Sequence, residues 1–360
     1  MEMKNEIKVG IIGCGNIART KHIPGLKKVE GVILRGFYSF YKSDAQVCCD
    51  TYGCKDSIVY DSVEQMLADQ SIDVVHICTP NNTHAELALM ALQANKHVMV
   101  EKPMAISSND AANLADCARR MGLKLTVGHQ HRFREDSQQL YRMVQAGMLG
   151  EIYYAKAHAI RRRGVPSWGS FLNKSIQGGG PLIDIGCHAL DLTLWLMDNY
   201  KPKMVVGTTY QKLGHQKGLT NSWGPWDTER FEVEDSAFGF ITMENGATLS
   251  LETSWALNSL DTSNITSRLC GTLGGADMCD GLRVNLDRHG ILQTIYPLAS
   301  NNFEFPPKQA LTPGDLEMAS WIQALRTDSD PVVKADQVAV VIRLIEAIYK
   351  SAALGKPVYL

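Results

Sequence analysis

Lys102 stands in a sequence setting that suits proton chemistry. The run 98–100 is apolar, Glu101 and Lys102 follow it side by side, and Pro103 then fixes the backbone φ angle. A rigid strand exit would hold the lysine ammonium at one repeatable point, which proton exchange with a bound hydroxyl requires. The alternative interpretation is a surface lysine that simply pairs with Glu101.

A second candidate set lies within the segment 178–198. Asp184, His188 and Asp191 recur at i, i+4 and i+7 in an otherwise apolar helical pattern, so they share one face. A buried acid or histidine costs free energy unless it is paired or functional. Asp184 is spaced to orient His188, which can act as a general acid or base. The alternatives are a helix cap with an internally bonded histidine, and a metal site. We expect no metal, because Asp-x-x-x-His offers only two ligands.

A glycine-rich turn near the start of the chain has the pattern G-x-G-x-x-A, between an apolar run and a helical pattern. The first glycine allows a tight turn, the second lets the backbone approach a pyrophosphate, and the small third residue allows close helix–strand packing. The helix N-terminus would stabilise the phosphate charge. A glycine turn that binds nothing is the alternative. The expected dinucleotide-binding residues are Gly13, Gly15, Asn16, Ile17 and Ala18.

The second apolar run ends where a dinucleotide site contacts the ribose. An NAD site usually places an acid there to bond the 2′-hydroxyl. The sequence instead has Ser39, with Lys42 close behind and Asp44 farther along. A hydroxyl and a cation suit a 2′-phosphate better than a carboxylate would. The cofactor is therefore expected to be NAD or NADP, with a lean away from strict NAD preference; alternatively, Ser39 only ends a strand.

The segments that follow the next two apolar runs carry further candidates for cofactor binding. Ligands in doubly wound folds lie beyond the carboxyl ends of the strands. Glu101 and Lys102 are therefore expected to line the cofactor groove. For Pro80 and Asn81, in the segment after the preceding apolar run, turn formation and helix capping are equally good explanations. The groove candidates in that segment are Thr79, Pro80, Asn81 and His84.

Short apolar runs alternate with amphipathic stretches over the first 127 residues. Strands that alternate with helices form right-handed βαβ units, so this pattern predicts a doubly wound parallel sheet in residues 1–127. The expected strands are 7–13, 32–38, 73–80, 96–103 and 124–128, and the clearest helices are 84–95 and 109–122.

Residues 128–360 have a different texture. Longer strand patterns at 151–163, 204–213 and 236–244 have few helices between them. Asn245-Gly246 signals a hairpin, because both residues tolerate positive φ. Two helical patterns close the chain and can pack back on the first domain. We expect an α/β fold overall, with a mostly antiparallel sheet in this second domain.

Length and composition narrow the function classes. The 360 residues are 45% hydrophobic and 21% charged, which is typical of a globular protein of about two domains. A net charge of −2, with Arg161–Arg163 as the one dense basic run, argues against nucleic-acid binding. There is no membrane-length apolar stretch and no signal-peptide pattern, and the nine cysteines are scattered. We therefore expect a cytoplasmic protein with no membrane partner.

Three motifs occur in an order and spacing that resemble the Gfo/Idh/MocA family of NAD(P)-dependent oxidoreductases: the fingerprint at residue 13, "EKP" at 101–103 and "GGGPLIDIGCHALD" at 178–191. The resemblance covers essentially the whole chain. It implies a Rossmann domain followed by an α/β domain with a large open sheet, which often serves as an oligomer interface in the family. A homo-oligomer (dimer, tetramer or larger) is therefore expected.

The same resemblance implies hydride transfer between a nicotinamide and a carbinol carbon of a sugar, polyol or inositol. It assigns the catalytic roles to Lys102, Asp184 and His188. In the expected mechanism His188, held by Asp184, takes the hydroxyl proton, and Lys102 hydrogen-bonds the developing alkoxide. Ser39 departs from the family pattern, in which many members carry an acid, and this leaves the cofactor choice open.

Three further segments, 161–169, 223–240 and 252–258, resemble a gut-bacterial branch of this family that oxidises the C3 hydroxyl of glucosides. Arg161–Arg163 can bind a charged substrate or form a solvated strand end. Aromatic rings can stack on a pyranose or belong to the core. The rings in question are Trp168, Trp223, Trp226 and Trp255. The candidate substrate-binding residues are Lys102, Arg163, Trp168, Asp184 and His188.

The expected substrate is a small sugar or glycoside. Two other functions stay open at this point: an inositol or polyol dehydrogenase, and a non-catalytic nicotinamide-binding sensor. A further possibility within the enzyme hypothesis is an oxidoreductase that keeps its cofactor tightly bound through the catalytic cycle.

Overall fold

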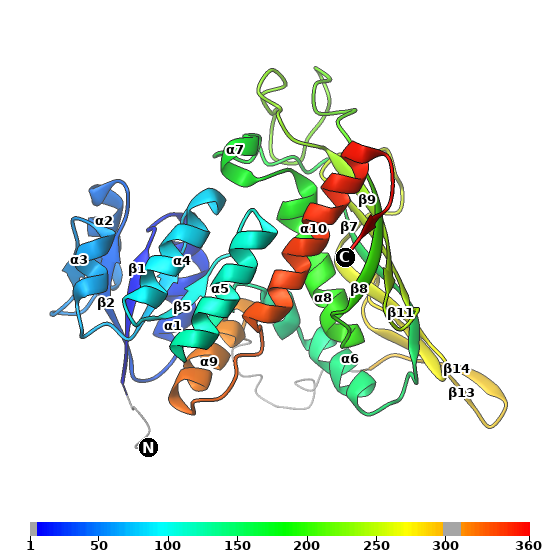
Figure 1. The fold of residues 1–360 in the computed structure, drawn as a ribbon, viewed down its shortest axis with the longest axis horizontal. Helices are drawn as coiled ribbons and strands as arrows, with labels where there is room; N and C mark the ends of the chain where they lie inside the picture. Colours follow the sequence, from blue (N-terminus) through cyan, green and yellow to red (C-terminus); the bar gives the residue numbers. More distant parts are fainter. Residues whose placement is uncertain (1–5, 298–310) are drawn as a thin grey trace. The chain divides into compact units, whose positions relative to one another are not determined.

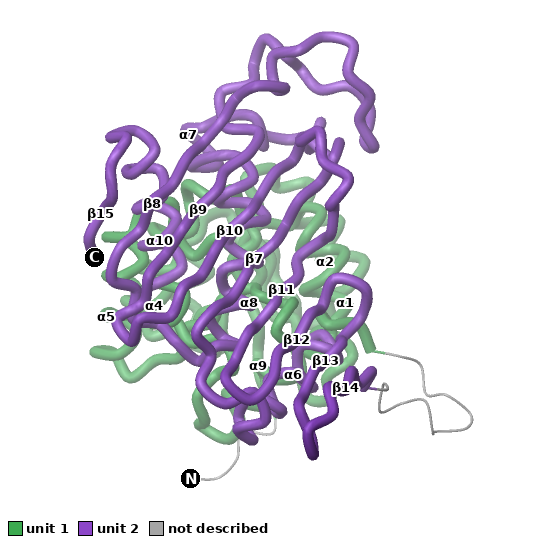
Figure 2. The backbone as a smooth tube through the Cα atoms, turned by 90° about the vertical axis from the view of Figure 1, so that its right-hand side faces the viewer, with its two compact units in different colours: residues 1–133, 311–339 green, residues 134–310, 340–360 purple. Residues whose placement is uncertain are grey.

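The computed structural model describes residues 6–297 and 311–360, and Figure 1 shows their ribbon. The chain divides into two compact units, coloured separately in Figure 2: residues 1–133 with 311–339, and residues 134–310 with 340–360. Each unit is thus built from two separate stretches of chain. The chain first passes from one unit to the other at residues 133–134, whereas the expected boundary lies at residue 127.

The first unit is built on six parallel strands in the order β3-β2-β1-β4-β5-β6. The strand order changes direction between β1 and β4, which confirms the predicted doubly wound arrangement. Ligands of such folds bind at this switch point, beyond the carboxyl ends of β1 and β4. The strands are β1 (Ile7–Ile12), β2 (Val32–Tyr38), β3 (Ile58–Val59), β4 (Val74–Ile77), β5 (His97–Val100) and β6 (Leu125–Val127).

Helices connect these strands, and local sequence sets several of their ends. Ser107 accepts a hydrogen bond from the N–H of Asp110 at the start of α5, and Gly122 ends this helix with a φ of 64°. Thr312 and Asp315 form a capping box at the start of α9. The helices are η1 (Ala18–His22), α1 (Ile23–Lys27), α2 (Lys42–Tyr52), α3 (Val63–Ala68), η2 (Asn81–Thr83), α4 (His84–Gln93), α5 (Ser108–Met121), η3 (Gln130–Phe133) and α9 (Pro313–Arg326).

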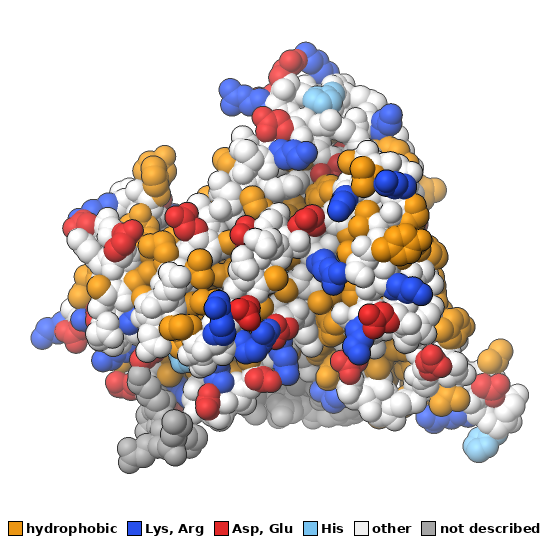
Figure 3. Space-filling view, viewed as in Figure 1, with side chains coloured by type: hydrophobic (Ala, Val, Ile, Leu, Met, Phe, Trp, Pro, Cys, Tyr) orange, Lys and Arg blue, Asp and Glu red, His pale blue; other side chains and the backbone are white. Residues whose placement is uncertain are grey.

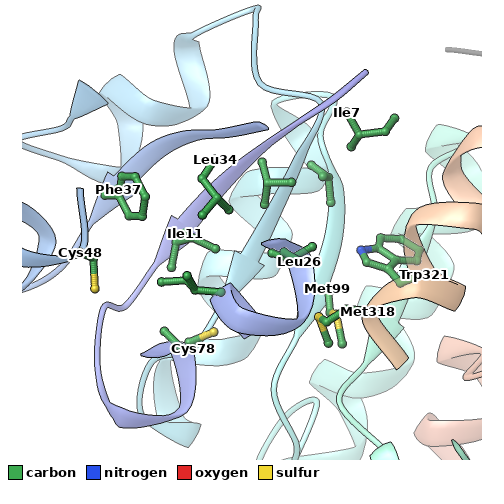
Figure 4. Packing of buried hydrophobic residues seen from close by; sticks show 14 of the residues in the cluster. Ile7, Ile11, Leu26, Leu34, Phe37, Cys48, Cys78, Met99, Met318 and Trp321 are labelled. Carbon is green, nitrogen blue, oxygen red and sulfur yellow. The ribbon is translucent and has the colours of Figure 1, made fainter. Parts of the chain in front are cut away.

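The core of the first unit lies between the sheet and its helices. Leu34 and Phe37 of β2 pack in one buried cluster with apolar residues of β1, and Figure 4 shows this packing. Met318 and Trp321 of α9 belong to the same cluster. Because α9 buries its apolar face here, the stretch 311–339 contributes to the hydrophobic stabilisation of this unit.

The second unit is built on a nine-stranded sheet in the order β14-β13-β12-β11-β7-β10-β9-β8-β15. Within the described residues, β7 and β10 pair in parallel and the other neighbours pair antiparallel, which confirms a mostly antiparallel sheet. The strands are β7 (Ile152–Ile160), β8 (Pro202–Tyr210), β9 (Ser236–Met243), β10 (Thr248–Ser254), β11 (Ser263–Gly271), β12 (Gly274–Asp277), β13 (Arg283–Arg288), β14 (Ile291–Ile295) and β15 (Val358–Tyr359).

Helices cover one face of this sheet. The helices in this part of the chain are α6 (Glu135–Gln145), α7 (Lys174–Gln177), η4 (Leu182–Gly186), α8 (Cys187–Met197) and α10 (Ala335–Leu354). α8 packs on β7 and β11, and Ile348 of α10 approaches Gly207 of β8. Figure 2 looks onto the opposite face, where the strands lie in front. Gly207 and Gly239 face Ile348 of α10, so the alternation along β8 and β9 directs the exposed side chains of Val206, Tyr210 and Phe240 to that opposite face.

The surface of the described residues carries charges of both signs. In Figure 3, acidic and basic side chains are interspersed over the face in view, in keeping with the net charge of −2. All nine cysteines are free thiols. None of the helices within residues 6–297 and 311–360 combines the length and the apolar character needed to cross a bilayer.

Candidate active site

The fingerprint loop is tightly packed at its first glycine and open at its second. Gly13 has a φ of 92°, and a Cβ atom there would lie 2.7 Å from the carbonyl oxygen of Cys78. A Cβ atom at Gly15 would have no neighbour within 4 Å. The chain becomes helical at Asn16, so a helix N-terminus lies next to this open space, and Ile17 and the fully buried Ala18 continue it. These residues fit a dinucleotide pyrophosphate, which needs backbone N–H groups and glycine-lined room.

Ser39 and Lys42 lie just beyond the carboxyl end of β2. The Ser39 hydroxyl accepts a hydrogen bond from the N–H of Cys14 in the fingerprint loop at 3.3 Å, which places Ser39 beside the expected cofactor. Lys42 Nζ forms a surface ion pair with Asp61. Because Asp61 already balances this cation, Lys42 attracts a 2′-phosphate less than its charge alone suggests.

Thr79, Pro80 and Asn81 follow the carboxyl end of β4, next to the fingerprint. The Cγ2 atom of Thr79 lies 2.9 Å from the position that a Cβ atom on Gly13 would take. Pro80 is exposed and Asn81 half-buried, and η2 starts at Asn81. All three remain candidates for the cofactor groove, because they stand at the switch point of the parallel sheet.

His84 links this segment to the turn that follows β5. Its Nδ1 lies 2.7 Å from the carbonyl oxygen of Pro103, and its Nε2 lies 2.8 Å from that of Thr79. The imidazole is 1% exposed. This differs from the expectation that His84 contacts the cofactor, because the buried ring already faces a backbone oxygen of each segment. Burial lowers the pKa of His84, and a neutral imidazole donates its single N–H to one of the two oxygens. We infer that His84 positions these segments relative to each other.

Glu101 lies at the centre of a buried charged network. Its Oε1 accepts hydrogen bonds from Lys21 Nζ at 2.7 Å and from His22 Nε2 at 2.8 Å, and its Oε2 accepts the N–H of Lys102 at 3.1 Å. Lys21 also pairs with Glu317 of α9 at 2.9 Å. Glu101 is thus a buried anchor with several partners rather than half of a simple surface ion pair. We infer that Glu101 anchors the backbone that carries Lys102, rather than lining the groove as expected.

Two neutral histidines extend this network away from Glu101. His22 Nδ1 and His76 Nδ1 are 2.9 Å apart, and both rings are fully buried. Because His22 uses Nε2–H to bond Glu101, its Nδ1 accepts the N–H of His76. Burial lowers the pKa of His22 and lowers that of His76 well below the usual range. Burial would raise the pKa of Glu101, but Lys21 and His22 outweigh this effect and hold it well below its usual range.

Acidification should destabilise the first unit through these histidines. A histidine whose pKa is lowered by folding is protonated first in the unfolded chain, so stability is lost as the pH falls below the usual value of 6.5. The expected loss is up to roughly 1.4 kcal/mol per pH unit for each histidine. Urea unfolding at several pH values measures this loss.

The matched variants for this prediction are His76→Asn and His289→Asn. The asparagine amide at position 76 can still donate to His22 but cannot be protonated, so the pH dependence should become shallower. His289 is exposed, and its replacement should leave the pH dependence as it is. Equal pH dependence in all three proteins would show that the buried pair does not contribute.

Asp184 and His188 lie at the start of a buried helical segment in the second unit. The segment begins with the π-helical turn η4, rather than the uniform α-helix that was expected, and continues directly into α8. His188 is 8% exposed. The indole Nε1 of Trp255 donates a hydrogen bond to Asp184 Oδ2 at 3.0 Å, and the Arg161 guanidinium attracts the same carboxylate. Such fixed donors give the carboxylate one orientation, as required of a group that orients a histidine.

Glu234 and Tyr349 hold the start of this segment. Glu234 accepts the N–H groups of Gly180 at 2.9 Å and Leu182 at 3.0 Å, and it accepts the Tyr349 hydroxyl at 2.8 Å. A Cβ atom at Gly180 would lie 2.1 Å from the backbone oxygen of Glu234, and one at Gly179 would lie 2.0 Å from the Tyr349 hydroxyl oxygen. Gly179 and Gly180 are therefore explained by the close approach of two residues that satisfy the helix start.

Replacing Glu234 with glutamine should loosen this helix start and slow turnover. Glutamine has one acceptor oxygen, so at least one of the three buried donors loses its partner, at a cost of roughly 1–3 kcal/mol. We expect the free energy of unfolding to fall by this amount. We also expect kcat to fall with unchanged cofactor affinity, because Asp184 follows in the next turn. The exposed Glu232→Gln is the matched control; wild-type stability and kcat in Glu234→Gln would refute the positioning role.

The remaining substrate candidates differ in their exposure. Trp168 and Trp223 are 52% and 43% exposed, and their rings meet edge to face with centroids 5.2 Å apart. They are available for stacking on a sugar. Arg163 lies beyond β7 and forms an isolated bridge with Ala256. The core interpretation holds for the two buried rings, Trp226 and Trp255.

Several residues of this arrangement were not identified from the sequence. Lys21 and His22 follow the fingerprint on the helix that it begins, where charged residues on a face that should be buried are a usable signal. Glu234 stands just before β9 at a polar position of the alternation that begins with Phe231, so the sequence gives no signal for its burial. Arg161 is visible in the sequence only as part of the basic run 161–163. Its proximity to Asp184, like the contact of Tyr349 with Glu234, arises from tertiary packing.

A dinucleotide-binding loop in one unit and a helix-borne acid and histidine in the other define the class of two-domain, nicotinamide-dependent oxidoreductases. Comparison with known families identifies the particular family. The family described as "Oxidoreductase family, NAD-binding Rossmann fold" matches residues 7–129, and the Gfo/Idh/MocA C-terminal domain matches residues 137–277. The chain belongs to the Gfo/Idh/MocA family of oxidoreductases.

Individual relatives match the whole chain. It is 37% identical to D-glucoside 3-dehydrogenase of Escherichia coli (strain K12) over 356 residues, which are 98% of this chain and 97% of that protein. Among solved structures it is similar to an NAD-binding protein from Listeria innocua, with a TM-score of 0.75, 26% identity and coverage of 98% and 97%. It has the fold of levoglucosan dehydrogenase in complex with NADH and levoglucosan, with a TM-score of 0.82, 20% identity and coverage of 98% and 99%.

Proposed function

We propose that this oxidoreductase oxidises a secondary hydroxyl of a sugar or glycoside, and that its target is C3 of a glucoside. The observation that carries the proposal is the 37% identity to D-glucoside 3-dehydrogenase, which extends over 98% of the chain. The geometry of the second unit supports catalysis over cofactor sensing, because Trp255 fixes the Asp184 carboxylate and Glu234 fixes the helix start. Binding a nicotinamide alone needs neither contact.

Two side chains act on the substrate in the proposed mechanism, and a third positions one of them. His188 accepts the hydroxyl proton. Asp184 orients the imidazole ring of His188 and stabilises the positive charge that forms on it. Lys102 donates a hydrogen bond to the same oxygen, whose negative charge grows as the carbon loses its hydride. The bound nicotinamide supplies the hydride acceptor. The substrate loses one proton from oxygen and one hydride from carbon, which converts the CH–OH group into a ketone.

We propose NAD(H) as the cofactor. Ser39 carries no charge for a 2′-phosphate, and Lys42 is already paired with Asp61. NAD⁺ should therefore support a higher kcat/KM than NADP⁺. We further propose that the cofactor stays bound tightly enough to survive purification, and extraction of denatured protein followed by nucleotide analysis tests this directly.

A substrate panel tests the proposed activity. Methyl β-D-glucopyranoside, D-glucose and myo-inositol are supplied with NAD⁺, and nicotinamide absorbance is followed. Carbon NMR of the product then locates the new ketone. The glucoside should be oxidised fastest and at C3. Faster oxidation of myo-inositol would favour a polyol dehydrogenase, and no reduction of NAD⁺ with any of the three would favour a sensor.

We propose that the chain forms a homo-oligomer through the exposed face of the nine-stranded sheet. Val206, Tyr210 and Phe240 are 38%, 41% and 47% exposed on this face, and exposed aromatic residues are enriched in interfaces. Phe240→Lys should lower the mass measured by light scattering to that of a smaller assembly. Leu260→Lys, which changes a 90% exposed loop residue, should not lower the mass. A monomeric wild-type protein would refute this proposal.

The nine free cysteines also support a cytoplasmic location, because reducing compartments keep thiols unpaired. We propose that the enzyme works there on small glycosides. Fractionation of cells with an antibody against the chain tests this location.

A further inference from the structure

The three consecutive arginines that follow β7 line a pocket at the ends of central strands of the nine-stranded sheet. Ile160, the last residue of β7, pairs with Ser254 of β10 and with Ser263 of β11. The segments that follow β7 and β10 and the segment that precedes β11 therefore meet at the pocket. The pocket has a volume of about 360 Å³. Its polar wall is formed by Arg161, Arg162, Arg163, Ser222, Ser263 and Asn264.

The positive charges in this pocket are not balanced by carboxylates at contact distance. Arg163 bonds the side-chain oxygen of Asn258 and the backbone oxygen of Arg162, both at 2.6 Å. Arg161 bonds the backbone oxygen of Gly164 at 3.3 Å. The Arg162 side chain is exposed and makes no hydrogen bond or ion pair with residues 6–297 and 311–360. The guanidinium groups of Arg162 and Arg163 have no acidic partner among the described residues, so both can donate hydrogen bonds to an oxyanion.

The pocket is continuous with the residues that surround Asp184. The Arg161 guanidinium lies 4.9 Å from the centroid of the Trp223 ring, and Trp223 lines the same pocket. Arg161 is also the cation that attracts Asp184, while burial lowers its own pKa from the usual value. A ligand that carries its anionic group to Arg162 and Arg163 therefore lies beside Arg161, which attracts the carboxylate proposed to orient His188.

We propose that this pocket binds an oxyanion carried by the substrate, so that the preferred glycoside bears a phosphate, sulfate or carboxylate group. This inference deepens the proposed function and rests on it for the identity of the sugar. The planar guanidinium forks of Arg162 and Arg163 suit such groups, because each can donate two parallel hydrogen bonds. The exposed ring of Trp223 provides an apolar surface for the part of the ligand next to the anion.

Direct binding tests the pocket without reference to turnover. Inorganic phosphate is titrated into the NAD⁺-saturated protein by calorimetry, so that the dinucleotide loop is already filled. Arg162→Gln should weaken phosphate binding about 10- to 100-fold, the cost of a lost charge-assisted contact. Arg230→Gln is the matched control, because Arg230 is exposed, pairs with Asp227 and does not line the pocket. Equal binding by the wild type and Arg162→Gln, or no saturable binding by the wild type, would overturn the proposal.

Kinetics then test whether the anion belongs to the substrate. Glucose 6-phosphate is compared with glucose, and 4-carboxyphenyl β-D-glucoside with its neutral carboxamide. The ratio of kcat/KM for the charged and neutral member of each pair should exceed one and should fall about 10- to 100-fold in Arg162→Gln. A ratio that Arg162→Gln leaves unchanged would show that the pocket does not bind the anionic group of the substrate. If phosphate binds as expected but no sugar is oxidised, the proposed function fails and the oxyanion site stands.

Discussion

Replacing Lys102 with alanine should remove most of the turnover and leave NAD⁺ binding intact. Its ammonium group is proposed to donate to the substrate oxygen as negative charge develops, and the loss of such a group lowers kcat by roughly 10²–10⁴-fold. The hydrogen bond to Glu101 is made by the backbone N–H of Lys102, which the variant keeps. The turn should therefore retain its shape. Steady-state kinetics with nicotinamide absorbance, together with a titration of NAD⁺ binding, separates the two effects.

Two further variants control this experiment. Lys55 is an exposed lysine of the same unit, and Lys55→Ala should keep wild-type kcat. Lys102→Arg keeps the positive charge but changes its position and its ability to exchange a proton, so its kcat should lie between those of the wild type and Lys102→Ala. Normal turnover by Lys102→Ala would mean that the assigned role is wrong.

Replacing His188 with alanine should cost a similar factor but leave a different signature. As the proposed general base, His188 must be neutral to accept the hydroxyl proton, so wild-type kcat/KM should fall in acid. In His188→Ala the expected loss is again roughly 10²–10⁴-fold in kcat, and this acid dependence should disappear. Added imidazole should restore part of the rate by entering the space left by the side chain.

His215→Ala is the matched control for this variant. His215 is exposed and bonds the backbone oxygen of Thr228 at 2.8 Å, so its loss should not change kcat or its pH dependence. An acid dependence that persists unchanged in His188→Ala would assign the base to another residue. Asp184→Asn should reduce kcat less than His188→Ala, because the amide oxygen can still accept the Trp255 indole N–H.

Much of the fold could be predicted because its local patterns are strong. The strands β4 and β5 are mostly apolar and almost entirely buried, as expected of parallel strands covered on both faces, with His76 as the polar exception in β4. The parallel pairing of β7 with β10 could not be predicted, because the two strands are far apart in the chain and their neighbourhood is decided by packing. The same applies to α9, whose amphipathic pattern is visible but whose partner in the first unit is not.

The site divides in the same way. Asp184 and His188 could be identified because polar residues on an apolar helix call for an explanation. The contacts that hold them could not, because their partners are distant in sequence: Tyr349 and Glu234 are separated by 115 positions. The buried network around Glu101 could not be predicted, for a related reason. The Glu101 partner Lys21 is 80 positions away, so the sequence showed only the adjacent Lys102.

Isotope transfer from the substrate tests the central claim most directly. A glucoside carrying deuterium at C3 is incubated with the enzyme and NAD⁺, and both free and protein-bound nicotinamide are then examined by mass spectrometry and NMR. The proposed reaction places the deuterium on the nicotinamide ring and leaves a ketone at C3. Deuterium that remains on the sugar while the cofactor is reduced would show oxidation at another carbon. An unreduced cofactor with unchanged glucoside would contradict the assignment of this chain as a glucoside dehydrogenase.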